Sequence, residues 1–379
     1  MNIVADERSK AEGPEMCGGG APLVVEGAAC TCCCGLGPMA PARESGADAV
    51  ARPAQPRVWS TTSTITRADR WDHLLARWGV NRSGHLAKPG LYSLGDPTPD
   101  SPVFVTANYT LSFDALRSAL AGIDGYILVL DTFGVNVWCA AGKGTFGTDE
   151  LVRRIEATAL HRVIDHRVLI LPQLGAAGVA AHEVKRRSGF KVEYGPVRAS
   201  DLPEYLENRQ ATPEMRRVRF PLRDRLILIP VELVHTLLPM VIAAVALFLI
   251  AGPLAAAGVV AAVLGGVVLF PILFPWLPTR RFSTKGFVLG GLVAFPFALA
   301  ALLGGPGTPL LLRAGWTLAY LLGLPPVTAY LALNFTGATP LTSKTGVRRE
   351  IFAYVPVMAG TSGAGVVLTV ALALFRLFG

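Results

Sequence analysis

Cys139 is the only cysteine in the part of the chain whose composition favours folding, and it lies within residues 136–143. The other five of the six cysteines fall within the first 34 residues, which are rich in glycine, alanine and proline. A lone thiol cannot form a disulfide within the folded part, so it is either a small buried hydrophobe or a group that does chemistry. An apolar strand-like run precedes it at 126–130 and glycines follow it, which favours the chemical role.

Three of these glycines, Gly142, Gly144 and Gly147, spell G-x-G-x-x-G before a helix that is expected to begin with Thr148 as its N-cap. A strand before the motif and a helix after it are what a dinucleotide fingerprint requires. A membrane sensor or scaffold with a dinucleotide-binding head therefore stays open as an alternative, although the long charged side chain of Lys143 counts against it. A P-loop is excluded because Gly144 stands where that motif needs Ser or Thr.

The run Asn-Val-Trp-Cys-Ala-Ala-Gly-Lys at 136–143 resembles the signature of the corrinoid protein of microbial mercury methylation. That family is similar to the large subunit of the corrinoid iron–sulphur protein of acetyl-CoA synthesis. The resemblance covers about residues 85–200 and is carried by segments 88–92, 101–109, 144–151, 169–175 and 179–184. The Trp-Cys pair with its flanking Asn and Gly-Lys is the specific part of the likeness.

The resemblance implies that the Cys139 thiolate is the lower axial ligand of the cobalt in a corrinoid (cobalamin) cofactor. The other common cobalamin motif, Asp-x-His-x-x-Gly, is absent from the sequence. The implied reaction is corrinoid-dependent methyl transfer to Hg(II), which gives methylmercury. Because Hg(II) needs a methyl group with carbanion character, a strong anionic donor on the opposite face of cobalt would favour this transfer, while the cofactor carries the reaction itself.

The expected corrinoid site extends beyond the cysteine. Its cofactor-binding residues are expected to be Thr106, Asn108, Asn136, Val137, Trp138, Cys139, Ala140, Ala141, Gly142, Lys143, Gly144, Thr145 and Gln173. Asn136 and the backbone near Gly142 are the expected hydrogen-bonding groups. Lys143 meets either a ring carboxamide or solvent, and Trp138 either walls the pocket or fills the core.

Reducing the cobalt requires electrons, and the sequence contains no iron–sulphur ligand set. The resemblance therefore implies a ferredoxin-like partner with two [4Fe-4S] clusters and a methyl donor such as methyltetrahydrofolate. Hg(II) and membrane lipid complete the expected partners, and no nucleic acid is expected. A membrane-bound corrinoid methyl carrier of one-carbon metabolism that never meets mercury is the alternative with the same chemistry.

Residues 1–64 are predicted to form a disordered segment because they lack apolar periodicity. A signal peptide is not expected, since no basic stretch leads into an apolar one. The segment contains a cluster whose spacing fits neither a zinc finger nor an iron–sulphur run, made of Cys30, Cys32, Cys33 and Cys34. Adjacent thiols bind soft metals, so the cluster either gathers Hg(II) or belongs to a non-functional or lipidated tail, which is the favoured interpretation.

Residues 65–200 predict an α/β corrinoid-binding domain with a mostly parallel sheet, because strand-like and helix-like segments alternate. The expected strands are 103–106, 126–131, 135–138 and 168–171, and the expected helices are 66–78, 113–121, 148–158 and 176–187. Ligands of such domains bind at the carboxyl ends of the strands. Segments 106–108, 136–143 and 172–173 would therefore meet in one pocket.

A mean hydropathy of +0.45 and long apolar runs predict an all-α transmembrane domain of five helices over 230–379, after a basic linker at 201–229. The runs cover about 231–251, 254–275, 286–304, 309–333 and 354–376, each close to the roughly 20 residues that cross a bilayer. Basic residues precede the first run and fill the second-to-third and fourth-to-fifth loops. This predicts a multi-pass protein of the cytoplasmic membrane with a cytoplasmic head and an outside C-terminus.

The fourth-to-fifth loop, residues 334–343, is polar and rich in hydroxyl groups, and it also resembles the family. It is either an ordinary cytosolic loop or a surface that faces the corrinoid-binding head. The sequence leaves both interpretations open.

Overall fold

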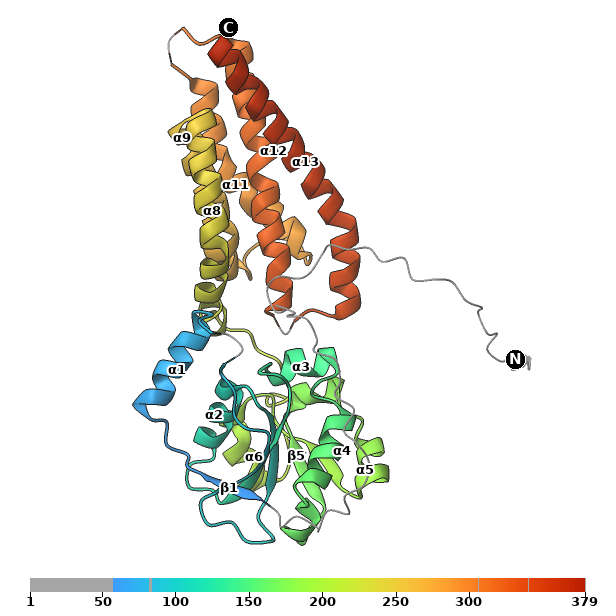
Figure 1. The fold of residues 1–379 in the computed structure, drawn as a ribbon. Helices are drawn as coiled ribbons and strands as arrows, with labels where there is room; N and C mark the ends of the chain where they lie inside the picture. The colour runs from blue at the N-terminus through green and yellow to red at the C-terminus, as the bar shows by residue number, and fades with distance from the viewer. Residues whose placement is uncertain (1–56, 82–83, 306, 340, 379) are drawn as a thin grey trace, which may run out of the picture.

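The computed structural model describes residues 57–81, 84–305, 307–339 and 341–378. They form a head that contains a β-sheet and a long bundle of helices above it (Figure 1). The predicted metal cluster of Cys30, Cys32, Cys33 and Cys34 lies outside the described residues, so its role stays a prediction.

A six-stranded sheet with the order β1-β2-β4-β3-β5-β6 forms the centre of the head. Its strands are β1 Val58–Thr61, β2 Gly90–Leu94, β3 Val103–Ala107, β4 Gly125–Leu130, β5 Val168–Leu171 and β6 Lys191–Tyr194. The β2–β4 pair is antiparallel and the other four pairings are parallel. The predicted α/β domain with a mostly parallel sheet is therefore confirmed.

Helices cover both faces of this sheet, which is why β3 and β4 are buried at every position. The helices of the head are α1 Arg67–Arg77, α2 Thr110–Ala119, α3 Val137–Lys143, α4 Thr148–Ala157, α5 Ala181–Ser188 and α6 Leu202–Asn208, with short 3₁₀ turns η1 Leu160–Arg162, η2 Gln173–Ala177 and η3 Ala199–Asp201. On one face, Leu151 of α4 and Val184 of α5 pack into one core cluster. On the other, Leu116 of α2 and Leu202 of α6 pack into a second.

Three strands escaped prediction, and one predicted strand is wrong. Residues 135–138 run into helix α3 instead of forming a strand, because the Asn136 side chain caps that helix. Strand β1 lies inside the segment predicted to be disordered; its Trp59 ring packs 5.2 Å from the Tyr92 ring of β2, centroid to centroid. The head thus begins before residue 65.

The helix boundaries also differ in places. The N-cap of α4 is Gly147, and the expected cap, Thr148, instead accepts a 2.9 Å hydrogen bond at Oγ1 from the Ala180 backbone N–H. The helix expected at 176–187 is split into η2 and α5. The break brings Gly178 so close to α3 that an added Cβ would lie 2.9 Å from the Ala141 Cα of that helix.

The predicted linker at 201–229 is only partly a linker. Leu202 and Tyr205 of α6, together with Met215, are buried in the core of the head. The short helix α7, Leu222–Leu226, then leads into the first long helix of the bundle. The head therefore extends past residue 200, because the apolar side chains of α6 complete its second core cluster.

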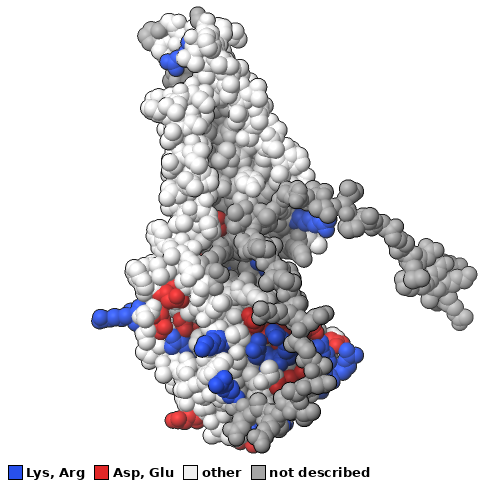
Figure 2. Space-filling view, viewed as in Figure 1, with Lys and Arg blue, Asp and Glu red and all other residues white. Residues whose placement is uncertain are grey.

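The bundle contains five helices that are long and apolar enough to cross a membrane, judged by length and composition among the described residues. Its elements are α8 Ile229–Ala251, α9 Pro253–Leu264, a π-helical segment η4 Gly265–Leu269, α10 Phe270–Leu273, α11 Phe282–Leu303, α12 Leu310–Asn334, η5 Phe335–Gly337 and α13 Lys344–Phe378. These helices agree with the five predicted apolar runs. Figure 2 shows that the bundle is almost bare of charged side chains on the face in view, whereas the head carries many.

Close helix packing and outward apolar side chains characterise the bundle. A Cβ built on Gly286 of α11 would lie 2.5 Å from Ala329 Cα of α12, so glycine permits the two backbones to approach. Large apolar side chains face outward, with Leu249 77% exposed and Leu292 66% exposed. The exposed apolar area of the bundle is therefore far larger than the surface of a soluble protein normally shows.

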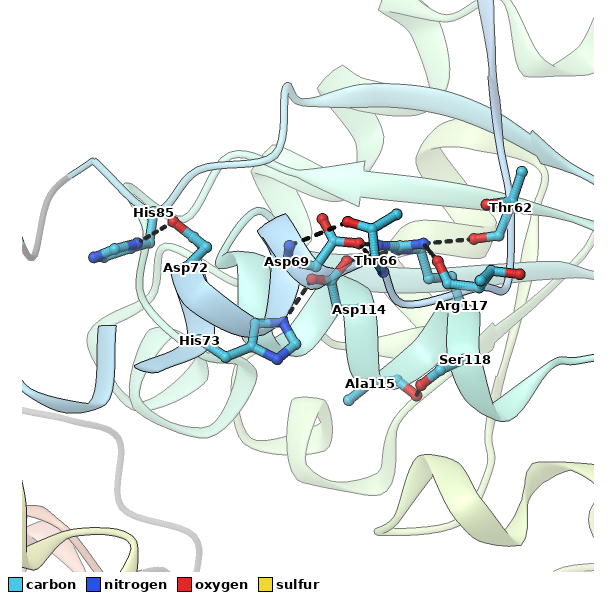
Figure 3. A network of polar contacts seen from close by, with 11 residues as sticks. Thr62, Thr66, Asp69, Asp72, His73, His85, Asp114, Ala115, Arg117 and Ser118 are labelled. Carbon is cyan, nitrogen blue, oxygen red and sulfur yellow. Dashed lines mark hydrogen bonds and ion pairs between the residues drawn. The ribbon is translucent and has the colours of Figure 1, made fainter. Parts of the chain in front are cut away.

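A buried ionic network fixes α1 to α2 in the head (Figure 3). The Arg117 guanidinium donates hydrogen bonds to Asp114 Oδ1 at 2.6 Å, to Asp69 Oδ2 at 2.8 Å and to the carbonyl oxygens of Thr62 and Thr64 at 2.7 Å. Burial by itself lowers the pKa of Arg117, but the hydrogen bonds to the two carboxylates outweigh it and raise that pKa above its usual value. The connection from β1 to α1 is thereby tied to α2.

The Arg117→Met variant should lower the free energy of unfolding of the head by about 3–5 kcal/mol, because the Asp114 carboxylate would stay buried with His73 as its remaining partner. Urea denaturation of the purified protein, followed by tryptophan fluorescence, measures this change. Arg186→Met, which removes a 73% exposed arginine from an ion pair on α5, is the control and should change stability by less than about 1 kcal/mol. Equal denaturation midpoints for the two variants would contradict the structural role of Arg117.

Candidate functional site

A cavity of about 330 Å³ opens at the carboxyl ends of β3 and β5, the edge at which the sequence places the ligand site. Thr106 ends β3 on one side, and Pro172 follows β5 on the other. Asn136, Val137 and Trp138 from the start of α3 form the wall between them. The structure thus brings together residues from three separate segments that were predicted to meet.

The opposite wall of this cavity comes from α2, from the segment that follows β6, and from the bundle. Ser112 and Leu116 contribute from α2, and Arg198 contributes from the segment after β6. Ala338, in the loop that follows α12, also lines the cavity. The loop at 334–343 therefore faces the head, which favours the second of its two predicted interpretations.

Helix α3 begins and ends where its sequence directs. The Asn136 side-chain oxygen accepts a 2.9 Å hydrogen bond from the Cys139 backbone N–H, which satisfies an amide that a helix start would otherwise leave unpaired. Gly144 ends the helix with φ +87°, a left-handed conformation that glycine adopts without strain. Cys139 therefore lies in the first helical turn, before which a strand had been expected.

The two faces of α3 have different surroundings. Ala140 and Ala141 are buried in the core of the head. Cys139 is half-buried and is not among the residues that line the cavity. Gly142 and Gly144 are exposed, and a Cβ built on either would meet no atom within 4 Å. The surface beside Cys139 is thus open to a bulky, flat ligand.

Asn108 has a structural role that the sequence analysis missed. It is 2% exposed, and its Oδ1 accepts hydrogen bonds from the Thr132 backbone N–H at 3.0 Å, the Thr132 hydroxyl at 2.8 Å and the Gly134 N–H at 3.0 Å. Its Nδ2 donates to Asp131 Oδ1 at 3.2 Å. Asn108 therefore holds the loop between β4 and α3. The cofactor contact expected for it stays a prediction.

Two other predicted residues lie beside the cavity rather than in it. Gln173 Oε1 accepts a 3.2 Å hydrogen bond from Arg216 on the exposed surface, while its neighbours Pro172 and Leu174 line the cavity. The Thr145 hydroxyl donates to the Ala140 carbonyl oxygen at 3.4 Å. Thr145 therefore stabilises the backbone of α3, whereas Gln173 bonds another side chain.

A buried carboxylate, Glu150 of α4, supports the same loop from the other side. Its Oε1 accepts a 2.8 Å hydrogen bond from the Asp131 backbone N–H, and it forms ion pairs with Arg153 and Arg154. Burial raises the pKa of Glu150, but the Asp131 amide and the two arginines together outweigh it, so that the pKa lies below its usual value. Sequence spacing alone gives no sign of this contact.

The dinucleotide alternative is wrong on geometric grounds. Gly142 lies inside α3, Gly144 ends it and Gly147 caps α4, so the three glycines join two helices. A dinucleotide fingerprint needs them between a strand and a helix. Within the described ranges, no group of three or more His, Cys, Asp or Glu residues is arranged to hold a metal ion.

Comparisons with known proteins place the likeness of this chain in its head. Residues 81–206 match a family described as CO dehydrogenase/acetyl-CoA synthase delta subunit. The acetyl-CoA decarbonylase/synthase complex subunit gamma of Methanopyrus kandleri is 38% identical over 128 residues, which cover 33% of this chain and 27% of that protein. The subunit gamma of Archaeoglobus fulgidus is 35% identical over 122 residues, which cover 32% and 26%.

The matched region includes Cys139 and the whole head side of the cavity, apart from the wall that the bundle supplies. The chain spans about a quarter of the length of these relatives. The bundle lies outside residues 81–206, which match the family. The names of the relatives contradict the prediction of a mercury-methylating protein, because they are subunits of an acetyl-CoA complex. That prediction took the likeness over about residues 85–200 for the mercury-methylating family, whereas nearly the same stretch, 81–206, matches the acetyl-CoA synthase family.

Glu150→Gln should lower the free energy of unfolding by about 1.5–3 kcal/mol at pH 7, the range for a hydrogen bond to a charged group. Because the folded-state pKa of Glu150 is depressed, its contribution is present above the unfolded pKa of about 4.3 and is lost as the pH falls through the folded pKa. Urea denaturation of both proteins at pH 7 and below pH 4 should show the difference shrinking with acid. A difference that stayed constant would show that charge on Glu150 is unimportant.

Proposed function

We propose that the head binds a corrinoid beside Cys139 and carries a methyl group in one-carbon metabolism. The observation that carries this proposal is the meeting of Thr106 and residues 136–138 at one cavity, inside the region that matches acetyl-CoA synthase subunits. The comparisons bear out the corrinoid that the sequence analysis expected. Mercury is not part of the proposal.

The residues around Cys139 fit such a cofactor. A corrinoid brings its own ring nitrogens to the cobalt, so the protein needs to supply only an axial ligand, and a thiolate is a suitable soft donor. The exposed backbone at Gly142 and Gly144 leaves room for a flat macrocycle to lie against α3. At about 330 Å³, the neighbouring cavity has room for a substituent of the ring rather than for the ring itself.

The chemistry divides between cofactor and chain. A bound corrinoid supplies a cobalt centre that accepts and donates a methyl group. The chain orients that centre: Asn136 fixes the turn that carries Cys139, while Asn108 and Glu150 fix the loop before it. Trp138 lines the cavity at the strand ends, which favours a place in the pocket wall over a place in the core.

Partner proteins are a further part of the proposal. The relatives are named as subunits of a complex, which supports partner subunits that deliver or receive the methyl group. A ferredoxin-like electron donor with two [4Fe-4S] clusters and a methyl donor such as methyltetrahydrofolate complete the proposed cycle. The open face of α3 is where a partner would have to approach the cofactor.

Cys139→Ala should weaken binding of added cobalamin by at least the ~10–100-fold caused by losing a supporting contact around a metal ligand. It should also change the visible absorption of the bound cofactor, because the cobalt loses its sulphur donor. Cys139→Ser is the matched control for size and should resemble Cys139→Ala, whereas Cys139→His should restore part of the affinity with a different spectrum. An unchanged spectrum in Cys139→Ala would remove the thiolate ligand from the proposal.

We also propose that the five long helices span the cytoplasmic membrane, with the head in the cytoplasm. Their lengths and their exposed apolar side chains support this arrangement. Arg280, in the loop before α11, and Arg349, in the first turns of α13, lie at the end of the bundle nearest the head (Figure 1). The turns at 252–253 and 304–305 lie at the other end and are uncharged (Figure 1). Basic residues of this kind stay on the cytoplasmic side.

Alkaline phosphatase fused after Gly379 or inserted after Gly305 should be active in whole cells, since both positions would lie outside. A fusion before Arg57 should be inactive, which serves as the control for the cytoplasmic side. Activity of the enzyme, normalised to the amount of fusion protein, is the measurement. Inactive fusions at both Gly305 and Gly379 would rule out the five-span arrangement.

A further inference from the structure

A groove of about 510 Å³ lies at the head-side end of the bundle, between the loop before α11 and the start of α13. Three arginines line it: Arg280 and Arg281 from that loop, and Arg349 from α13. The hydroxyl-bearing residues Ser343 and Tyr354 line it as well. Two basic segments that are far apart in the sequence, the loop before α11 and the start of α13, thus form one concave surface.

The positive charge of the groove is not neutralised by neighbouring carboxylates. Among described residues, no ion pair involves Arg280, Arg281 or Arg349; Arg281 instead contacts the Tyr354 hydroxyl at 3.2 Å. Glu350 is the one acidic residue in the lining, and its Oε1 accepts a 2.5 Å hydrogen bond from the Ser283 backbone N–H. Three arginines therefore face one carboxylate that is already bonded.

Helix geometry adds to this positive field. The 22-residue helix α11 begins at Phe282 and the 35-residue helix α13 begins at Lys344, so both N-terminal ends border the groove. Unpaired N–H groups at a helix start favour a negative charge nearby. The groove thus combines three arginine side chains and two helix ends of the same sign, and Glu350, which is bonded to the Ser283 N–H, compensates only part of this positive charge.

We propose that this groove binds a phosphate-bearing anion, and that its source is the headgroup of an anionic membrane phospholipid. Arginine guanidinium groups match the geometry of phosphate oxygens. Apolar residues lie beside the arginines, with Phe282 and Val347 in the lining, and Phe352 is 70% exposed nearby on α13, where an acyl chain would lie. Basic pockets between transmembrane helices on the cytoplasmic side bind such headgroups.

This inference rests on the proposed membrane embedding and is independent of the corrinoid. The bound headgroup would hold the beginnings of α11 and α13 together against the repulsion of their arginines. Arg280 and Arg349 are the residues to change, because neither side chain forms a hydrogen bond or an ion pair within the described part of the chain. Their replacement should leave the fold intact.

The experiment uses the full-length protein purified from membranes in detergent and titrated with phosphatidylglycerol or with phosphatidylcholine of the same acyl chains. Native mass spectrometry should show preferential retention of phosphatidylglycerol. The double variant Arg280→Gln/Arg349→Gln should retain it roughly 30-fold less. Arg280→Lys/Arg349→Lys, which keeps the charge, should recover part of the binding.

Arg348→Gln is the matched control. Arg348 is the neighbour of Arg349 on α13, but its guanidinium lies 5.7 Å over the Phe352 ring and it does not line the groove. Equal weakening by Arg348→Gln would reveal general charge attraction and overturn the site, as would equal retention of the two lipids. An unchanged elution volume and an unchanged far-UV circular dichroism spectrum in each variant verify that the fold is intact.

A separate titration with inorganic phosphate distinguishes the source of the anion. Competition by phosphate only at concentrations far above those of the lipid supports a lipid headgroup. Binding of inorganic phosphate by the wild-type protein, together with equal retention of phosphatidylglycerol and phosphatidylcholine, would overturn the lipid source. Recovery of the protein in the soluble fraction without detergent would refute the membrane embedding itself, before any lipid is tested.

Discussion

The geometry of the site depends on the buried amide of Asn108. A polar side chain at the end of a buried strand requires hydrogen-bond partners, and Asn108 finds them in the loop at 131–134. These bonds fix the direction in which the chain leaves β4. Two residues after the last of these contacts, Asn136 caps α3, so the position of Cys139 follows from two asparagine side chains in succession. Glu150 and the close packing of Gly178 hold the same loop and helix from the side of α4 and η2.

The sequence predicts the centre of the head well because β3, β4 and β5 are continuous apolar runs, as strands buried on both faces must be. Strands β1 and β6 lie at the edges of the sheet, and their sequences, Val-Trp-Ser-Thr and Lys-Val-Glu-Tyr, mix polar and apolar residues, so their apolar pattern is weak. Helix α3 escaped prediction because seven residues are too few to show a helical period. Asn136, the residue that caps this helix, was instead predicted to form hydrogen bonds with the cofactor.

The supporting residues could not be found from spacing. Asn108 acts on residues 23 to 26 positions away, and Glu150 acts on an amide 19 positions before it. Such contacts exist only once the sheet has brought β3 and β4 side by side. A cavity does lie at the strand ends where the sequence predicted a site. The structural roles of Asn108 and Glu150, which hold the loop before Cys139, could not be predicted in the same way.

The head and the bundle share one structural element, the loop between α12 and α13. Ala338 reaches the cavity of the head, while Leu341, Thr342 and Ser343 line the arginine groove. The Thr342 hydroxyl donates a 2.9 Å hydrogen bond to the Thr336 carbonyl oxygen, which closes the loop on itself. A ligand in either proposed site would restrict the same short segment, so occupation of the groove would limit the ways in which Ala338 can sit on the cavity. The hydroxyl groups of this loop stabilise it, because the Thr342 hydroxyl satisfies a backbone carbonyl within it.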